Sequence, residues 1–244
     1  KGWEFELATT NVKTKDFSWK TSFNITIPKN KLLRFPNMDQ TAYAQQYRIG
    51  SPLNISLLFK YDGIDPETGF PRVLDVNGDN RYSYEDRIVI ENRGREFYGG
   101  ISNDFKYKGW SLSFLWDFTK QSGQSWSRGY PGRDKTNRTY AEYMAWQDGT
   151  LYIEDSAAAS TSYGLMKESD QGISDASYIR LKTLNYYLPS KFLEKLRINS
   201  LGFFLSTQNL FTITSYKGIN VDNPIFPGTL PPLRTFTTGI QLTL

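Results

Sequence analysis

Apolar and polar residues alternate along much of the chain. In GWEFEL, Trp3, Phe5 and Leu7 fall on one face and the two glutamates fall on the other. This period of two is typical of a β-strand whose faces meet different surroundings. The same alternation returns in DFSWKTSFNITI, in WSLSFLWDF and in the final RTFTTGIQLTL. The pattern therefore predicts an all-β chain.

About eight segments carry this pattern, and most are roughly nine to fifteen residues long, against the usual five or six for a strand. Strands of that length suit a tilted path across a bilayer. The segments cover residues 2–7, 16–27, 47–61, 96–107, 110–118, 176–188, 201–213 and 234–244.

The connections between these segments are very unequal. Only Lys108 and Gly109 separate two of them, as in a tight hairpin, whereas residues 121–174 form a long polar excursion. Short turns at one end and long loops at the other are typical of outer-membrane barrels. If the short turn is periplasmic, counting strands puts residues 62–94, 121–174 and 212–232 at the external end.

Composition excludes several classes of function. The chain has no Cys and no His, so thiol and imidazole chemistry, the usual zinc sites and Ser/His or Cys/His hydrolases are excluded. The net charge of +4 is small and its lysines and arginines are scattered, so nothing supports nucleic-acid binding. Paired carboxylates fall in expected loops, and no residue is assigned a catalytic role.

Neither a membrane-spanning helix nor a signal peptide is expected. The sequence has no run of about eighteen apolar residues, and Lys1 is not followed by a charged start and an apolar stretch. The chain is therefore expected to be cytosolic, or to be a processed or partial chain. A membrane barrel built from amphipathic strands would also lack such a run, because apolar and polar residues alternate along each strand.

The order of the segments resembles a known family. The hairpin FYGGISNDFKYKGWSLSFLWDF, residues 174–224 and the ending PLRTFTTGIQLTL are similar to the C-terminal part of SusC/RagA-type TonB-dependent transporters. Residues 1–32 and IGSPLNISLLFKYDGIDPETG resemble the strands that precede it in that family. The resemblance runs from about residue 1 to residue 244.

The resemblance implies both a fold and a function. Residues 1–244 are expected to be the C-terminal part of an antiparallel transmembrane β-barrel, about eight strands of a plugged barrel of about 22. The plug and the TonB-contacting segment lie outside this chain. The family imports oligomeric nutrients, oligosaccharides or peptides, through the outer membrane of Gram-negative bacteria. A SusD-like lipoprotein closes over its external mouth, the TonB complex supplies energy, and outer-membrane lipid surrounds the barrel. No enzyme activity is expected.

The stretch DVNGDNRYSYED, residues 75–86, fits the twelve-residue calcium loop. Asn80 stands where Gly is usual, the last position is Asp rather than the longer Glu, and no flanking helices are expected. A bound Ca²⁺ would be structural and would stiffen an external loop. The alternative is an Asx-rich turn that bonds to its own backbone and holds no ion. The expected ligands are Asp75, Asn77, Asp79, the Arg81 carbonyl, Ser83 and Asp86.

Two further sets of side chains are candidates for contact with cargo or the lumen. Aromatic residues of the long excursion could stack on sugar rings or contact a lid protein. Alternatively, they could form small cores that hold the loop in shape. These residues are Trp126, Tyr130, Tyr140, Tyr143 and Trp146. The polar faces of the strands are expected to line a plugged lumen; they include Glu4, Glu6, Lys20, Asp117, Arg180, Lys182 and Gln208.

Two other folds remain open at this point. A secreted, calcium-stabilised β-sandwich that binds carbohydrate shows the same alternation, although its strands are usually shorter. A complete small barrel of about eight strands is the second alternative. It predicts that GWEFEL pairs with RTFTTGIQLTL.

Overall fold

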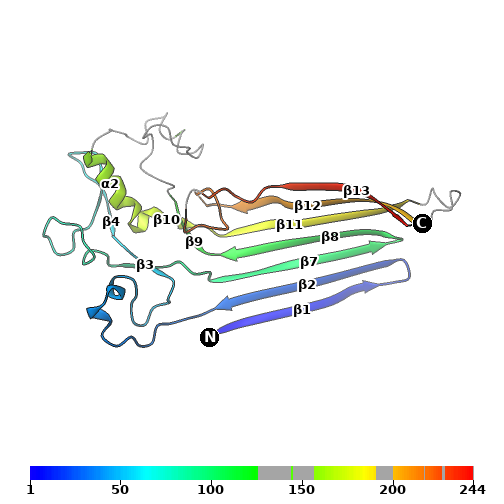
Figure 1. Ribbon diagram of the computed structural model, residues 1–244, viewed down its shortest axis with the longest axis horizontal. Helices are drawn as coiled ribbons and strands as arrows, with labels where there is room; N and C mark the ends of the chain where they lie inside the picture. Colours follow the sequence, from blue (N-terminus) through cyan, green and yellow to red (C-terminus); the bar gives the residue numbers. More distant parts are fainter. Residues whose placement is uncertain (126–143, 145–156, 191–199, 217, 227–228, 244) are drawn as a thin grey trace.

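The long strands form one antiparallel sheet in the computed structural model, which describes residues 1–125, 144, 157–190, 200–216, 218–226 and 229–243 (Figure 1). The sheet has seven strands in the order β1-β2-β7-β8-β11-β12-β13. They are β1 (Gly2–Lys13), β2 (Phe17–Pro28), β7 (Phe97–Tyr107), β8 (Trp110–Lys120), β11 (Tyr178–Ser190), β12 (Ser200–Thr214) and β13 (Thr235–Thr243).

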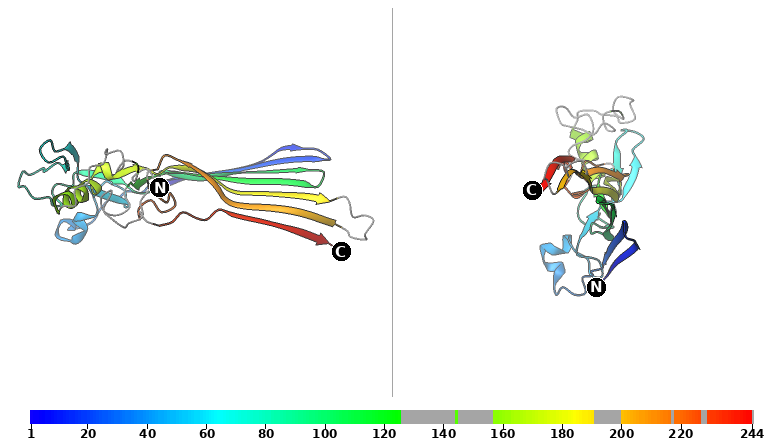
Figure 2. Two further views of the ribbon diagram at one scale, coloured as in Figure 1. Left: turned by 90° about the horizontal axis from the view of Figure 1, so that it is seen from above. Right: turned by 90° about the vertical axis from the view of Figure 1, so that its right-hand side faces the viewer.

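Each long strand pairs with the long strand that follows it in the chain. Figure 2 shows the result as a single twisted layer, and no second long sheet packs on it in the described part of the chain, as a sandwich would require. Among the described residues, β1 and β13 are the two edges and do not pair with each other. The sandwich and the closed small barrel are therefore both wrong for this chain.

The turns and the loops lie at opposite ends of the sheet (Figure 1). The β1–β2 turn and the Lys108–Gly109 turn share one end with the last residues of β13. Lys108 and Gly109 have φ angles of 47° and 90°, as a two-residue hairpin turn requires. The described parts of residues 62–94, 121–174 and 212–232 lie at the other end, so the predicted separation of loops and turns is confirmed.

Residues 47–61 do not form a long strand, and that prediction is wrong. Two short strands, β3 (Ile55–Leu58) and β4 (Tyr61–Ile64), lie beyond the end of the long sheet and pair with β6 (Val89–Asn92) and β5 (Pro71–Val73). Gly50, with φ of 89°, begins a bend just before Pro52, which has no amide hydrogen for a sheet. Residues 29–96 therefore form one excursion at the loop end.

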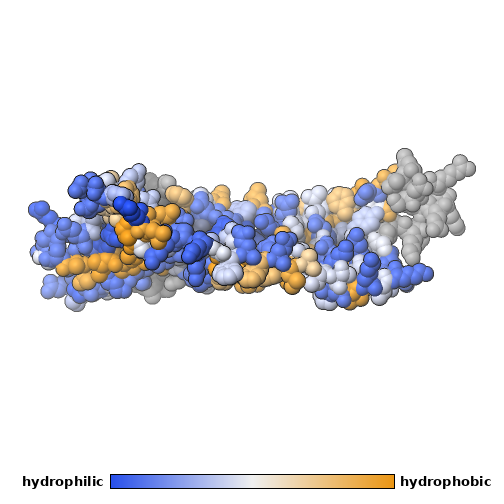
Figure 3. All heavy atoms as spheres, turned by 90° about the horizontal axis from the view of Figure 1, so that it is seen from below, coloured by the Kyte–Doolittle hydropathy of each residue, from blue (hydrophilic) through white to orange (hydrophobic). Residues whose placement is uncertain are grey.

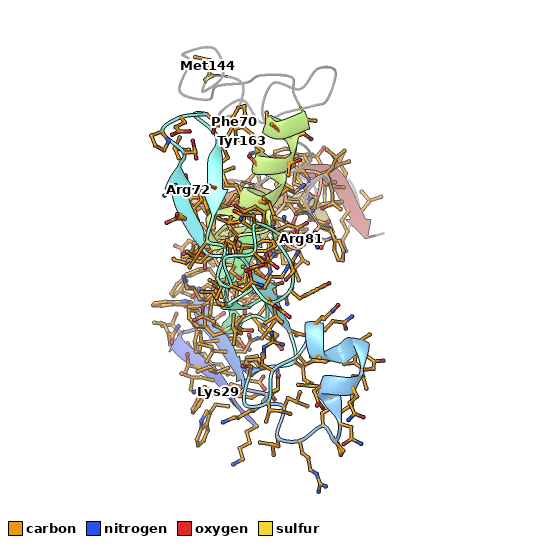
Figure 4. The ribbon with its side chains drawn as sticks, turned by 90° about the vertical axis from the view of Figure 1, so that its left-hand side faces the viewer. Lys29, Phe70, Arg72, Arg81, Met144 and Tyr163 are labelled. Carbon is orange, nitrogen blue, oxygen red and sulfur yellow. The ribbon has the colours of Figure 1, made fainter. Side chains whose placement is uncertain are left out.

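A helix covers part of this loop end. α2 (Ala157–Lys167) lies in the excursion that was expected to be loop, and η3 (Asp170–Gly172) follows it. Figure 4 shows Tyr163 of α2 facing Phe70 near the β4–β5 hairpin. Tyr163 and Met166 of this helix form a small core with Tyr61 outside the sheet. Other apolar residues buried at this end are Leu57, Leu58, Phe59, Phe70, Val73 and Ala159.

The remaining short elements complete the loop end. β9 (Ser122–Gln124) and β10 (Ile173–Asp175) pair directly beyond β8 and β11, and two short 3₁₀ helices, η1 (Met38–Gln40) and η2 (Ala42–Gln45), follow β2. No helix in the described part of the chain is long and apolar enough to cross a membrane.

Candidate functional site

One face of the long sheet is apolar across all of its strands. The register places Trp3 opposite Ile27, and cross-strand partners share a face. Trp3 is 67% exposed and Ile240 is 64% exposed, so this face lacks a covering layer where they lie. Figure 3 shows several separate apolar patches between hydrophilic areas on one side of the molecule. Exposed apolar surface of this extent indicates contact with lipid or protein rather than water.

Aromatic side chains gather toward both ends of this apolar face. Near the turn end, Trp19 stacks on Phe105 with 5.5 Å between ring centroids, and the Trp19 indole donates to the Asn103 side chain at 2.9 Å. Nearer the loop end, the Phe97 and Phe118 rings meet edge to face with 6.3 Å between their centroids. Aromatic groups at two levels are typical of strands that cross a bilayer, because these rings favour its interfaces.

The opposite face of the sheet is polar. Glu4 and Glu6 pair with Thr26 and Asn24, and Lys20 pairs with Asp104 on the next strand. The register continues this face across the sheet to include the other inward residues that the alternation predicted, Asp117, Arg180 and Gln208. Lys182 differs from them, because it lies in an irregularity of the register between Leu181 and Thr183.

Arg180 joins the polar face to the loop end. Its side chain is buried, its Nε donates to Thr212 Oγ1 at 3.0 Å, and its Nη1 forms an ion pair with Asp222 Oδ2 at 2.9 Å. The guanidinium lies 4.8 Å from the Tyr178 ring centre, and the Tyr178 hydroxyl donates to Asp117 at 3.4 Å. Alternation placed Arg180 inward, but no signal in the sequence paired it with a loop residue 42 positions away.

Two ion pairs fix the helix end against the hairpins of the loop end. Lys60 pairs with Asp170, whose second oxygen accepts from the Tyr61 amide at 2.8 Å. Arg87 pairs with Glu168. Asp170 has a lowered pKa, because its hydrogen bonds from Lys60 and Tyr61 outweigh the desolvation that burial imposes. These contacts connect segments more than eighty positions apart in the chain.

Comparison with known proteins identifies the arrangement. The chain is 25% identical to the TonB-dependent receptor P3 of Formosa agariphila, over 99% of this chain and 28% of that protein. It is 24% identical to the TonB-dependent receptor SusC of Bacteroides thetaiotaomicron, over 99% of this chain and 26% of that protein. The structure of the RagAB peptide importer in its open-open state superposes on this chain with a TM-score of 0.71 at 20% identity. The superposition covers 100% of this chain and 28% of the importer chain. No protein-family model matches the chain.

The chain is homologous to TonB-dependent receptors of the SusC type and fits a C-terminal portion of them. It spans less than a third of the length of these relatives. The expected fold, an antiparallel portion of a transmembrane β-barrel, is confirmed, and the sheet contributes seven long strands to it.

The predicted calcium loop of this receptor portion closes on its own backbone. The Asp75 carboxylate accepts from the amides of Gly78 and Asn80, both at 2.8 Å. Asn80 has a φ of 60°, the left-handed conformation that the position normally reserves for Gly. Asn77 and Asp79 accept from the amides two residues further on, at 3.1 and 2.8 Å. The contacts are those of an Asx-rich turn.

Asp86 anchors the end of this loop. Its side chain is fully buried and accepts from the amides of Val76 at 2.9 Å and Ser83 at 2.8 Å. These bonds, with the Ser83 amide first, lower its pKa. The Arg81 side chain is exposed in this loop. Among the described residues, no three acidic, His or Cys side chains group as a metal site. Calcium binding at Asp75, Asn77, Asp79, Arg81, Ser83 and Asp86 stays a prediction.

The aromatic candidates for cargo or lid contact lie outside the described residues. They are Trp126, Tyr130, Tyr140, Tyr143 and Trp146. Their assignment stays a prediction of the sequence.

Proposed function

We propose that the receptor containing this chain imports oligomeric nutrients across the outer membrane of a Gram-negative bacterium, with energy from the TonB complex. The observation that carries the proposal is the two-faced sheet of long strands, which superposes over the full chain on the RagAB peptide importer with a TM-score of 0.71. The relatives that share the sequence are TonB-dependent receptors. Transport of this kind needs no catalytic residue.

The two faces and the two ends of the sheet suit import across a membrane. The apolar face would contact lipid, because aromatic and aliphatic side chains lie on it along every long strand and many of them, such as Trp3, Phe211 and Ile240, are exposed. The polar face, with its Ser, Thr and Asn side chains, would line the lumen beside the plug. The loop end would face outward, because outer-membrane barrels have their long loops outside and their short turns in the periplasm.

The partners follow from the same comparison. A SusD-like lipoprotein would close over the loop end, and TonB would act on a part of the receptor outside this chain. Support comes from the relatives SusC and RagAB. The cargo is an oligosaccharide or a peptide. The structural relative is described as a peptide importer, which concerns that protein alone.

Uptake by whole cells tests the proposal. Cells that carry the full-length receptor should accumulate fluorescent oligosaccharides or oligopeptides of one class, and accumulation should fall to background when either the receptor or TonB is removed. Cells with an unrelated porin serve as the control for leakage. Accumulation that persists without TonB would show that this receptor is not a TonB-driven importer.

A further inference from the structure

A cavity of about 710 Å³ lies at the loop end of the molecule. This volume falls in the range of roughly 300–1,000 Å³ that is usual for ligand pockets. Four separate segments supply its walls: residues 45–58, 84–93, 124 with 167–173, and Ile225. Two arginines, Arg87 and Arg93, are among the lining residues.

Arg87 is held by the protein itself. It pairs with Glu168 and donates to the Leu57 carbonyl at 3.3 Å. Its guanidinium also lies 4.6 Å from the Phe59 ring centre and 5.1 Å from that of Tyr84. Only its Nε lacks a hydrogen-bond partner. These contacts assign Arg87 to the wall of the cavity.

Arg93 lines the same cavity but, among the described residues, lacks the ion pair that holds Arg87. Its side chain is only 8% exposed, and its Nε and Nη1 are buried without a hydrogen-bond partner. No ion pair to Arg93 occurs among the described residues. Its backbone amide donates to the Asn54 carbonyl at 2.7 Å, which extends the β3–β6 ladder and fixes where the side chain starts.

An unpaired buried guanidinium is costly to the folded protein. Arginine stays protonated in proteins, so burial removes hydration from a full positive charge. Burial lowers the pKa of Arg93, and the attraction of Glu91 and Tyr216 offsets this in part. Buried charges in native proteins are almost always paired. Among the described residues, the acid that lines this cavity is Glu168, which already pairs with Arg87, so none of them forms an ion pair with Arg93.

We propose that Arg93 binds a carboxylate group of the imported oligomer. Guanidinium N–H groups match the two oxygens of a carboxylate, and such hydrogen bonds are among the strongest in proteins. The carboxylate can belong to an acidic peptide or to a uronic-acid oligosaccharide. This inference rests on the proposed import function and names the chemistry of its cargo.

Equilibrium binding to the full-length receptor in detergent tests the inference. Isothermal titration would compare tri-galacturonic acid with galactotriose, and acetylated triglutamate with acetylated triglutamine amide. We expect one of the anionic probes to bind about tenfold more tightly than its neutral counterpart, the worth of one charge-assisted hydrogen bond. If the anionic sugar binds more tightly than its neutral counterpart, the cargo is a glycan. If the anionic peptide does so, the cargo is a peptide.

Two matched substitutions locate the effect. Arg93→Met should remove the preference for the anionic probe, whereas Arg95→Met should leave it, because the Arg95 side chain is exposed and lies 5.4 Å from the Tyr98 ring. Arg93→Met should also leave the melting temperature unchanged or raise it, since an unpaired buried charge is removed.

Three results would overturn the inference: no preference in the unchanged receptor, a preference that survives Arg93→Met, or a melting temperature lowered by Arg93→Met. The last would show that an acidic side chain elsewhere in the receptor pairs with Arg93. TonB-dependent uptake of neutral oligomers would persist in each of these cases, so the import proposal is tested separately.

Discussion

Asp86 combines burial with two backbone hydrogen bonds, so its role in loop 75–86 does not need an ion. We expect Asp86→Ala to lower the melting temperature of the receptor to the same extent with calcium and with a chelator, because two amides lose their acceptor. Thermal unfolding under both conditions measures this. A loss seen only in calcium would contradict it and would support the calcium prediction.

Asp175 gives a pH-dependent contribution at the loop end. Hydrogen bonds from Ser177 and Lys120 lower its pKa from 3.8 to about 2. The folded state thus binds this proton less readily than the unfolded state, so the stabilisation is complete above pH 4 and fades as the pH falls toward 2. The side chain is about half exposed, which limits the size of the effect.

The matching variant is Asp175→Asn. The melting temperature of the unchanged receptor should exceed that of the variant at pH 6, and the difference should narrow between pH 4 and pH 2 as Asp175 takes up its proton. Melting curves across this range measure it. A difference that stays constant down to pH 2 would mean that the carboxylate charge contributes nothing.

Arg180 is the residue that secures the loop between β12 and β13. Arg180→Met should cost about 1–3 kcal/mol of local stability, because Asp222 and Thr212 lose a charged hydrogen-bond donor. Hydrogen exchange of residues 215–226 should rise accordingly. Lys182→Met is the control, since Lys182 is exposed and lies outside the paired register. Equal exchange in the two variants would contradict this role.

At the scale of elements, the two faces of each long strand carry the strongest prediction. Ile101 and Ser102 are neighbours in the middle of β7, on the apolar and the polar face. Arginine on a lipid-facing strand position costs about 2–4 kcal/mol near the middle of the bilayer, and little in a polar lumen. Ile101→Arg should therefore reduce folding into lipid vesicles far more than Ser102→Arg. Gel-shift assays of folded barrel measure both.

The elements that the sequence predicted are those with two clearly different faces. β2 and β8 are examples, because alternation runs through most of each strand. The loop end has no such pattern. Leu57, Leu58 and Phe59 are consecutive and all buried, so β3 ends among contacts on every side. Alternation cannot detect such a segment, and its apolar run led to the prediction of a long strand over residues 47–61.

α2 was missed for a related reason. Its sequence AAASTSYGLMK contains a Gly and several hydroxyl residues, which are weak helix formers. Its apolar stripe reduces to Ala159, Tyr163 and Met166, which become recognisable only when the β4–β5 hairpin lies against them. The ion pairs of Arg180 and Arg87 join distant segments in the same way. Such partners depend on the fold and leave no local signal.

At the scale of the whole molecule, the sheet has two unpaired edges, β1 and β13, in the described part of the chain. Exposed long edges and an uncovered apolar face are strong causes of aggregation. The orientation of this sheet in the membrane is the property that decides which residues can meet cargo.

Cysteine labelling tests that orientation, because the chain itself contains no cysteine. Arg81 is exposed in the connection between β5 and β6 at the loop end, and Lys108 lies in the tight turn between β7 and β8. In an otherwise cysteine-free full-length receptor on intact cells, a membrane-impermeant maleimide should label Arg81→Cys and spare Lys108→Cys. Both should react once the outer membrane is opened. If only Lys108→Cys were labelled on intact cells, the barrel would have the opposite orientation in the membrane. The Arg93 cavity would then lie on the periplasmic side.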